Sequence, residues 1–315
     1  MRRSRIACLV FLAGLTAGGS ACRRNAGAEG GKGQAARPEV VRVKSLPRPG
    51  HVVVVIEENK GYGQIIGNPQ APYINSLASR SVLFKRSYAL THPSQPNYLA
   101  LFSGSMQGIA DDSCPHDLSG ANLASELRAA DLDFAVFSES MPDQGYTGCR
   151  RGTYVRKHNP AVNWQRRGRF PPSWNLPFRS FPRDFSKLPT VNFVIPNLDH
   201  DMHDGSITQG DAWLRKNMGP YIRWAGRNNS LFILTWDEDD FTRANHIVTM
   251  FSGGVIRPGV SESRINHYSV LRTLEDMYGL AHLGETRFSH PVESVWKNAP
   301  KAAGTASGAT AERSR

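Results

Sequence analysis

The chain has 315 residues, of which 40% are hydrophobic and 21% are charged. This balance excludes a disordered or fibrous chain, and the length is sufficient for one large hydrophobic core, so we expect one main domain. The formal net charge of +11 favours anionic partners such as phosphorylated metabolites, lipid headgroups or nucleic acid, but charge alone does not choose among them.

The N-terminal segment has the features of a secretory signal peptide. Three arginines within the first five residues precede an apolar run from Ile6 to Leu15, and small residues follow it. The apolar run is too short to span a bilayer. We therefore expect residues 1–21 to be removed when the protein is exported to the periplasm or the medium. Cys22 would then be either a lipid-modified first residue or an ordinary residue of the mature chain.

Composition also separates a folded body from two unpatterned ends. The segment after the signal peptide is rich in Gly, Ala and Arg without periodicity, and the last residues are equally unpatterned. Such segments do not bury enough apolar surface to fold. We expect a flexible leader at 22–47, one folded domain at 48–298 and a disordered tail at 299–315.

The interpretation of the four cysteines depends on whether the protein is exported. Cys8 leaves with the signal peptide and Cys22 lies at the cleavage site, so Cys114 and Cys149 remain in the folded body. In an oxidising compartment two such cysteines most simply form one disulfide. The alternative is a pair of unrelated buried thiols.

The body alternates short apolar runs with helical patterns, which indicates an α/β fold with a largely parallel central sheet covered on both faces. In chain order we expect strands at 51–59, 81–90 (as one strand or two), 133–140, 190–197, 230–240 and 246–254. We expect helices at 72–80, 97–104, 121–130, 210–226 and 267–280.

Polar clusters follow strand after strand in this pattern. They are EEN at 57–59, THPSQPN at 91–97, NLDHDMHD at 197–204 and WDEDD at 236–240. Because the carboxyl ends of parallel strands share one edge of an open α/β sheet, residues far apart in sequence converge there. We expect the functional site at that edge.

Ser94 lies between a strand and the beginning of a helix, where unpaired backbone N–H groups and the helix dipole favour a negative charge or a bound phosphate. Pro93 and Pro96 restrict the backbone on both sides and hold the hydroxyl in place. The alternative is that Ser94 only caps the helix.

Two of the clusters have the composition of a metal site. Asp199 and His203 stand close in sequence, with His200 and Asp201 between them, and such a density of acidic and imidazole groups suits a divalent cation. The run of four carboxylates from Asp237 to Asp240 repels itself unless cations or water screen it. A solvated acidic turn is the alternative for each cluster taken alone.

Several long motifs in order resemble one known family. They are IEEN, THPSQPNY, the segment from Cys114 to Leu127, YVRKHNPAVNW, IPNLDHDMHDGSITQGDAWL, TWDEDD and NHYSVLRTLEDMYGL. Together they resemble the bacterial phosphoesterase family of acid phosphatases and phospholipases C. The resemblance implies the fold of the alkaline phosphatase superfamily, a three-layer sandwich with a central mostly parallel sheet. It also implies hydrolysis of phosphate monoesters, with phosphatidylinositol 3-phosphate as one substrate of the members it resembles most.

The same resemblance assigns roles to single residues. It implies that Ser94 is the nucleophile and that Asn97 donates to the transferred phosphoryl oxygens. It implies one or two divalent metal ions, with ligands at Glu58, Asn59, Asp199, His203, Asp237, Glu238 and His246. Where members that bind two zinc ions have an Asp-His pair, this chain has Asp237 and Glu238, so a harder cation or a single ion is equally compatible with the residues.

The hypothesis that follows is two successive phosphoryl transfers, from the ester to Ser94 and then from phosphoserine to water. Lys157 would offset charge on the phosphoryl oxygens together with the helix N-terminus. An imidazole charged below pH ~6.5 is suited to protonating the leaving oxygen. The candidates for this acid are His158, His200 and His267.

The loop at 150–184 interleaves Arg and Lys with Tyr, Trp and Phe. This composition is typical of contact with an anionic membrane, so the loop is a candidate for docking on bilayers that contain phosphoinositide. Single-stranded nucleic acid binding has the same composition, and a plain solvated loop is the third alternative. We expect no specific nucleic-acid partner.

Two other functions compete with the monoesterase. A phosphodiesterase of the phospholipase C type would use the same kind of site. An exported protein that binds anionic lipid or nucleic acid without catalysis would retain the basic loop, but it would not need acidic clusters, which oppose anion binding unless metal neutralises them.

Overall fold

The structure is a computed structural model that describes residues 46–166 and 170–297. The expected signal peptide, Cys22, nearly all of the expected leader and the expected tail lie outside the described residues. These expectations therefore stay predictions.

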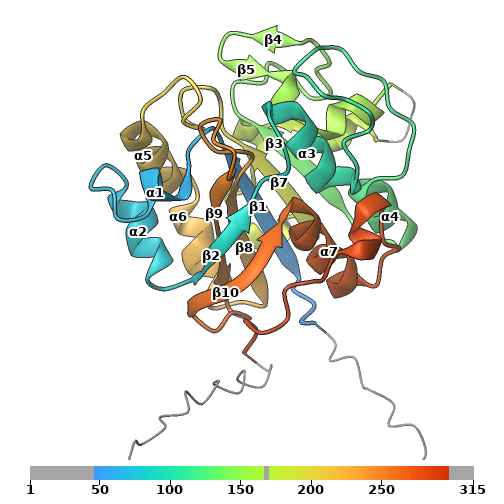
Figure 1. Ribbon diagram of the computed structural model, residues 1–315. Helices are drawn as coiled ribbons and strands as arrows, with labels where there is room; N and C mark the ends of the chain where they lie inside the picture. The colour runs from blue at the N-terminus through green and yellow to red at the C-terminus, as the bar shows by residue number, and fades with distance from the viewer. Residues whose placement is uncertain (1–45, 167–169, 298–315) are drawn as a thin grey trace, which may run out of the picture. The chain divides into compact units, whose positions relative to one another are not determined.

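An eight-stranded sheet forms the centre of the molecule (Figure 1), with the strand order β10-β2-β9-β8-β1-β7-β3-β6. Its strands are β1 (His51–Glu57), β2 (Val82–Tyr88), β3 (Phe134–Ser138), β6 (Asn175–Pro177), β7 (Val191–Ile195), β8 (Ser230–Trp236), β9 (His246–Gly253) and β10 (Gly259–Asn266). Only β9 is antiparallel to its neighbours among these strands, so the expectation of a mostly parallel sheet is confirmed.

Helices cover both faces of this sheet, and the alternation of side chains along β1 shows why. Val52, Val54 and Ile56 face one hydrophobic cluster, whereas Val53 and Val55 face the other. A strand buried on both faces is expected to be continuously apolar. The first cluster includes residues of α3 (Ser94–Ser103), α4 (Leu123–Ala129) and α7 (His267–Tyr278). The second includes residues of α1 (Tyr62–Ile65), α2 (Pro72–Ala78), α5 (Ile207–Asn217) and α6 (Gly219–Ala225). The predicted three-layer α/β sandwich is confirmed.

The sequence expectations differ from the structure at several elements, among them one helix and one edge strand. The single helix expected at 210–226 is two helices, α5 and α6, which meet at Met218. Gly219 and Pro220 follow at once, and proline has no N–H to continue the hydrogen bonds of the preceding helix. Strand β10 was not expected, because most of its residues are exposed and polar at the edge of the sheet.

The helix after β2 begins earlier than the expected position 97. Ser94 is the first residue of α3, and Pro96 lies in its first turn. Proline is tolerated there because the first N–H groups of a helix have no intrahelical partner. Ser94 therefore lies at the N-terminus of α3.

The connection between β3 and β7 has little regular structure. It contains the short antiparallel ribbon of β4 (Arg150–Arg151) and β5 (Tyr154–Val155). Short 3-10 helices follow at Arg156–His158, Ala161–Trp164, Pro172–Trp174, Phe178–Ser180 and Phe185–Lys187, and another at Gly284–Phe288 follows α7.

The expected disulfide is present and joins Cys114 to Cys149. It links the loop after α3 to the segment that leads into β4. None of the helices within the described residues combines the length and the apolar character needed to cross a bilayer.

Candidate active site

The neighbouring strands β8, β1 and β7 bring three of the polar clusters together. These strands are adjacent and parallel, so their carboxyl ends meet at one edge of the sheet. Glu58 and Asn59 follow β1, Asp237 and Glu238 follow β8, and the loop with His203 follows β7. Strand β2 runs in the same direction, and the segment after it leads to Ser94.

Ser94 lies between two buried carboxylates. Its Oγ atom is 3.0 Å from Oε2 of Glu58 and 3.2 Å from Oε1 of Glu238. All three side chains are at most 1% exposed. The N-cap position of α3 belongs to Pro93, so the hydroxyl of Ser94 is not a capping group and that alternative is excluded.

Asn59 and Asp237 complete this side of the cluster. The backbone N–H of Asn59 donates to Oδ1 of Asp237 over 3.3 Å. The end of the Asn59 side-chain amide lies 3.0 Å from Oε2 of Glu58 and 3.2 Å from Oε1 of Glu238. The residue has a positive φ of 51°, a conformation that asparagine tolerates better than most residues. This conformation accompanies a side chain directed at the two glutamates.

On the other side of Glu58 lies a buried imidazole. Nε2 of His158 is 3.1 Å from Oε1 of Glu58, and Nδ1 of His158 is 3.1 Å from Oδ2 of Asp201. The hydroxyl of Tyr98 donates to Oε1 of Glu58 over 2.5 Å, and its ring stacks on the imidazole. Asp201 also accepts the backbone N–H of His203.

Lys157 and His203 lie where the cluster meets solvent. Nζ of Lys157 donates to Oδ2 of Asp112 over 2.7 Å and lies 3.4 Å from Nε2 of His203. Oδ1 of Asp112 accepts the backbone N–H of Gln95, in the first turn of α3. Asp112 therefore links Lys157 to the turn that presents Ser94.

Burial dominates the electrostatics of the carboxylates. It raises the pKa of Glu58 well above its usual range, and the charges of Asp237 and Asp201 add to this effect. Burial also raises the pKa of Asp237 to about 7 and, together with the charge of Asp237, that of Glu238 to about 9. Without a compensating positive charge, this cluster would therefore hold protons.

The basic groups respond in opposite directions. Burial, followed by the charges of Lys157 and His203, lowers the pKa of His158 well below its usual value, so this imidazole is neutral. Burial works against the charge of Lys157 as well, but its hydrogen bond to Asp112 and the nearby Glu58 outweigh burial and raise its pKa.

The donor set at this site fits a divalent cation. Glu58, His158 and His203 can each direct one ligand atom to within 4.8 Å of the others'. Oδ2 of Asp237 is buried without a hydrogen-bond partner among the described residues, and Nε2 of His158 is buried with its 3.1 Å approach to Oε1 of Glu58 but without a hydrogen bond of good geometry. A cation would satisfy both atoms and favour the charged form of the carboxylates.

Three predicted site residues make other contacts. The ring of His200 contacts Glu139 through Nδ1 and stacks on Trp213. The backbone N–H of Asp199 donates to the side chain of Asn197, and it is Asp201, two residues later, that contacts His158. The ring of His246 stacks on aromatic residues and contacts the carbonyl of Lys85, and its role as a metal ligand stays a prediction.

Asn97 and His267 hold the backbone around the cluster. The amide of Asn97 accepts the N–H groups of Leu90 and Thr91 and donates to carbonyls of the same loop. Nε2–H of His267 donates to the carbonyl of Asp237 over 2.7 Å, and burial lowers the pKa of this imidazole to about 4. Their catalytic roles also stay predictions.

Sequence reasoning did not select four residues that contact the cluster. They are Tyr98, Asp112, His92 and, as a site residue, Asp201. Tyr98 lies four residues after Ser94 on the same helix, where i and i+4 share a face. Asp201 lies midway between the expected ligands Asp199 and His203. His92 lies within the polar cluster at 91–97, but no pattern there distinguished it from its neighbours, and Asp112 stands in a loop without a signal in the sequence.

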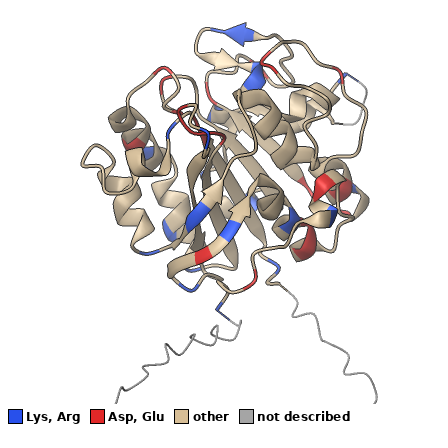
Figure 2. Cartoon of the chain, in the orientation of Figure 1, with Lys and Arg blue, Asp and Glu red and all other residues tan. Residues whose placement is uncertain are grey.

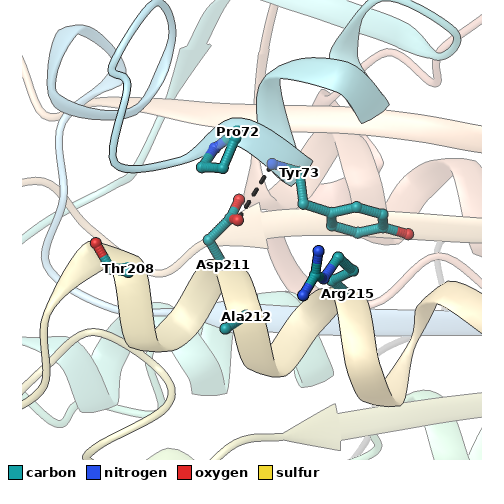
Figure 3. A pocket seen from close by; sticks show the side chains of 6 residues that line it. All are labelled: Pro72, Tyr73, Thr208, Asp211, Ala212 and Arg215. Atoms are coloured by element: carbon teal, nitrogen blue, oxygen red, sulfur yellow. Dashed lines mark hydrogen bonds between the residues drawn. The ribbon is translucent and has the colours of Figure 1, made fainter.

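A surface pocket of about 400 Å³ lies elsewhere, between α2 and α5 (Figure 3). Its central carboxylate, Asp211, accepts the backbone N–H groups of Tyr73 and Ile74 and so stabilises the start of α2. This carboxylate has a structural partner already, and the pocket does not include Ser94.

Comparison with known proteins finds relatives over most of the chain. A model of the phosphoesterase family matches residues 67–281. The chain is 47% identical over 264 residues to the phosphatidylinositol-3-phosphatase of Mycobacterium tuberculosis, covering 82% of this chain and 87% of that protein. It is 32% identical to an acid phosphatase of Aspergillus fumigatus over 66% of this chain, and it spans 51% of the fungal protein.

Among solved structures, a protein of the alkaline phosphatase superfamily from Vibrio parahaemolyticus shares the fold, with a TM-score of 0.52 and 15% identity over 79% of this chain and 72% of that chain. The family model covers most of the chain, and the aligned segment contains the serine turn after β2 and the acidic turn after β8. The chain belongs to the phosphoesterase family.

Proposed function

We propose that this protein is a phosphoric monoester hydrolase that uses Ser94 as its nucleophile. The observation that carries the proposal is the hydroxyl of Ser94, which stands at the N-terminus of α3 between the buried carboxylates of Glu58 and Glu238. The names of the phosphatase relatives from M. tuberculosis and A. fumigatus support the same reaction.

One or two divalent cations complete the proposed site. On the side of Ser94, the oxygen ligands would come from Glu58, Asn59, Asp237 and Glu238. On the other side, the ligands would be Glu58 and the imidazoles of His158 and His203. Asp201 would orient His158 from behind, because a ligating imidazole usually donates its other N–H to a carboxylate. When bound, a divalent cation would supply positive charge that lowers the pKa of the serine hydroxyl and stabilises negative charge on the oxygens attached to phosphorus.

The chain's own residues then account for the two transfers. Oγ of Ser94 attacks phosphorus in line, the bond from phosphorus to the alcohol oxygen breaks, and the proton of Ser94 passes by way of a carboxylate beside it to the leaving alcohol oxygen. In the second step water attacks the phosphoserine, the bond from phosphorus to Oγ breaks, one proton of the water returns to Ser94 and orthophosphate is released. The N-terminal N–H groups of α3 and Lys157 face the charge that develops on the phosphoryl oxygens.

The geometry bears on the proton donor for the leaving alcohol. Burial lowers the pKa of His158 and that of His267, which favours their neutral forms, and Nδ1 of His200 contacts Glu139 rather than a residue of the cluster. His203 is 26% exposed beside Lys157. We therefore place substrate entry on the side of His203 and Lys157.

A phosphoinositide at a membrane surface is the substrate that we propose. The M. tuberculosis relative is named for phosphatidylinositol 3-phosphate. In this chain, Arg150 and Arg151 of β4 are both exposed, and Figure 2 shows this basic strand at the end of the molecule to which β2 and β10 point. Residues 150–184 would contact anionic lipid there, although 167–169 lie outside the described residues.

Export is also part of the proposal. The disulfide between Cys114 and Cys149 is compatible with an oxidising compartment. Anchoring through Cys22 lies outside the described residues and stays a prediction.

The decisive variant is Ser94→Ala. Phosphate release from p-nitrophenyl phosphate and from phosphatidylinositol 3-phosphate should fall by about 10⁴-fold or more. The Tm should stay within about 2 °C, because the variant removes one hydroxyl and no packing.

Ser103→Ala is the matched control, since Ser103 is buried in the same helix but bonds to the carbonyls of Leu99 and Ser105. It should keep activity. p-Nitrophenyl phosphorylcholine serves as the diester probe. Full activity in Ser94→Ala would rule out the proposed nucleophile, and faster hydrolysis of the diester by the unmodified protein would indicate the phospholipase C alternative.

A further inference from the structure

Phe241 is an exposed aromatic residue in an unusual backbone conformation beside the proposed site. Phe241 is 64% exposed. Among the described residues, Val260 and Phe288 are the other large hydrophobic residues that are exposed. The φ angle of Phe241 is 68°. A bulky residue with positive φ is a genuine outlier, and such strained residues tend to occur at functional sites.

The loop that presents Phe241 is held by a network of hydrogen bonds. Asp239 accepts the backbone N–H and the hydroxyl of Thr242, and also the backbone N–H of His246. The backbone N–H of Asp239 donates to the side chain of Asn245 over 2.8 Å. The side-chain amide of Gln64 donates to Asp240. The exposed ring is therefore presented from a fixed loop.

A chain of contacts through His92 and Glu238 connects this ring to Ser94. The ring of Phe241 stacks on His92, with centroids 4.8 Å apart and planes 20° from parallel. Nδ1 of His92 lies 2.7 Å from Oε2 of Glu238, whose other oxygen contacts Ser94. The ring is thus exposed at one side of the site, which we call its rim, while the polar groups that would take the phosphoryl group are buried.

We propose that Phe241 is a specificity residue that packs against the alcohol portion of the phosphate ester and favours a leaving group with a ring or another apolar face. This inference rests on the proposed function and deepens it. The phosphoryl group occupies the polar interior, so the alcohol must extend toward the rim. An aromatic face there attracts C–H groups and rings but contributes little to a small polar alcohol.

Two other roles for Phe241 make different predictions. If the ring only positions His92 and, through it, Glu238, its loss lowers kcat for every substrate alike. If the ring inserts into a lipid surface, its loss matters only for substrates in vesicles.

The test compares 2-naphthyl phosphate with glycerol 2-phosphate for Phe241→Ala and Phe241→Trp. In Phe241→Ala the ratio of kcat/KM for the naphthyl ester to that for the glycerol ester should fall about 5- to 10-fold, mainly through KM. Phe241→Trp should restore or raise the ratio, because it returns an aromatic face. An equal loss for both esters, no change in the ratio, or a loss confined to phosphatidylinositol 3-phosphate in vesicles would overturn the proposal.

Phe288→Ala is the matched control. Phe288 is 80% exposed and ends the 3-10 helix that contacts Gly104, at the opposite end of α3 from Ser94. Its ratio should equal that of the unmodified protein.

A binding measurement separates this inference from the proposed function. The Kd of 2-naphthyl phosphate for Ser94→Ala, measured by naphthyl fluorescence, should rise about 5- to 10-fold when Phe241→Ala is added, and the Kd of orthophosphate by competition should not follow it. An unmodified protein that releases no phosphate would contradict the proposed function alone, whereas an unchanged naphthyl Kd would contradict the role of Phe241.

Discussion

A carboxyl group that is fully buried is stable as an anion only beside positive charge or several hydrogen-bond donors. Glu58, Asp237 and Glu238 lie together with few such donors, and burial raises the pKa of each. Charge repulsion and desolvation would make this arrangement costly in a protein that used these residues only for packing. At the scale of the residue, the burial of these carboxyl groups together supports the proposal that a cation binds here.

Removal of metal should therefore change stability as well as activity. Dialysis against a chelator should abolish phosphate release and lower the Tm. A cation whose free concentration is 100 times its Kd stabilises the folded protein by about 2.7 kcal/mol, and dialysis removes this contribution. Addition of one divalent cation at a time should restore both and identify the ion. Bound metal is measured by elemental analysis of the protein before and after dialysis.

Asp201→Asn is the informative variant in that experiment. Loss of the charge behind His158 should weaken cation affinity about 10- to 100-fold. Asp240→Asn, in the loop after β8 and bonded to Gln64, is the control and should bind the cation normally. Equal affinity in the two variants would contradict the role of Asp201.

At the scale of the element, helix α7 begins beside the site and packs against one face of the sheet. Its first residue, His267, holds the carbonyl of Asp237. Nearer its C-terminus, Oε1 of Glu275 accepts the backbone N–H of Leu283, while Oε2 is buried without a hydrogen-bond partner among the described residues. Burial raises the pKa of Glu275 to about 7.

This raised pKa makes stability depend on pH with a definite sign. The folded protein binds the Glu275 proton more tightly than the unfolded chain does, so the contribution is complete below about pH 4.5 and is lost as pH rises through about 7. Glu275→Gln keeps the acceptor for Leu283 without the ionisation. Relative to this variant, the unmodified protein should lose about 1–3 kcal/mol of unfolding free energy between pH 5 and pH 8.

Urea denaturation at several pH values measures this difference. Glu293→Gln, which alters an exposed carboxylate, should show a pH profile parallel to that of the unmodified protein. If the pH profile of the unfolding free energy of Glu275→Gln is also parallel to that of the unmodified protein, Glu275 does not titrate in this range.

At the scale of the whole molecule, the same edge of the sheet combines an acidic interior with a basic exterior. The buried carboxylates follow β1 and β8, whereas the exposed Arg150 and Arg151 belong to the ribbon in the β3 to β7 connection. Such an arrangement would attract an anionic surface to the outside of the site and would leave the interior for a cation and one phosphoryl group.

Charge reversal of the ribbon tests this arrangement. Arg150→Glu with Arg151→Glu should reduce binding to vesicles that contain phosphatidylinositol 3-phosphate by about tenfold or more, since each basic residue near such a surface contributes about 1 kcal/mol. The same change at Arg223 and Arg227, which are exposed on α6 and the turn after it, should have little effect. Sedimentation at two salt concentrations measures both, and equal losses would indicate a general effect of net charge.

Much of this molecule could be predicted from local sequence. Short segments determine the apolar runs of β1, β7 and β8, the amphipathic helix α7 and the polar residue types that follow the strands. Burial on two faces requires continuous apolar residues, and burial on one face requires periodic ones. The pairing of Cys114 with Cys149 followed from their number once export was assumed. Ser94 could be chosen as a candidate from its place between a strand and the beginning of a helix, whereas the roles of Glu58, Asp237 and Glu238 were implied by the resemblance to the phosphoesterase family.

What the sequence did not determine was which neighbours these candidates meet. Asp201 rather than Asp199 contacts His158, His200 faces Glu139, and His92 connects Glu238 to Phe241, because each of these contacts depends on how a loop folds back on the sheet. Local propensity fixes the elements, which gain stability from their own periodic burial. Only the tertiary structure decides the distances between loops that are more than a hundred residues apart in the chain, and the chemistry of the site depends on those distances.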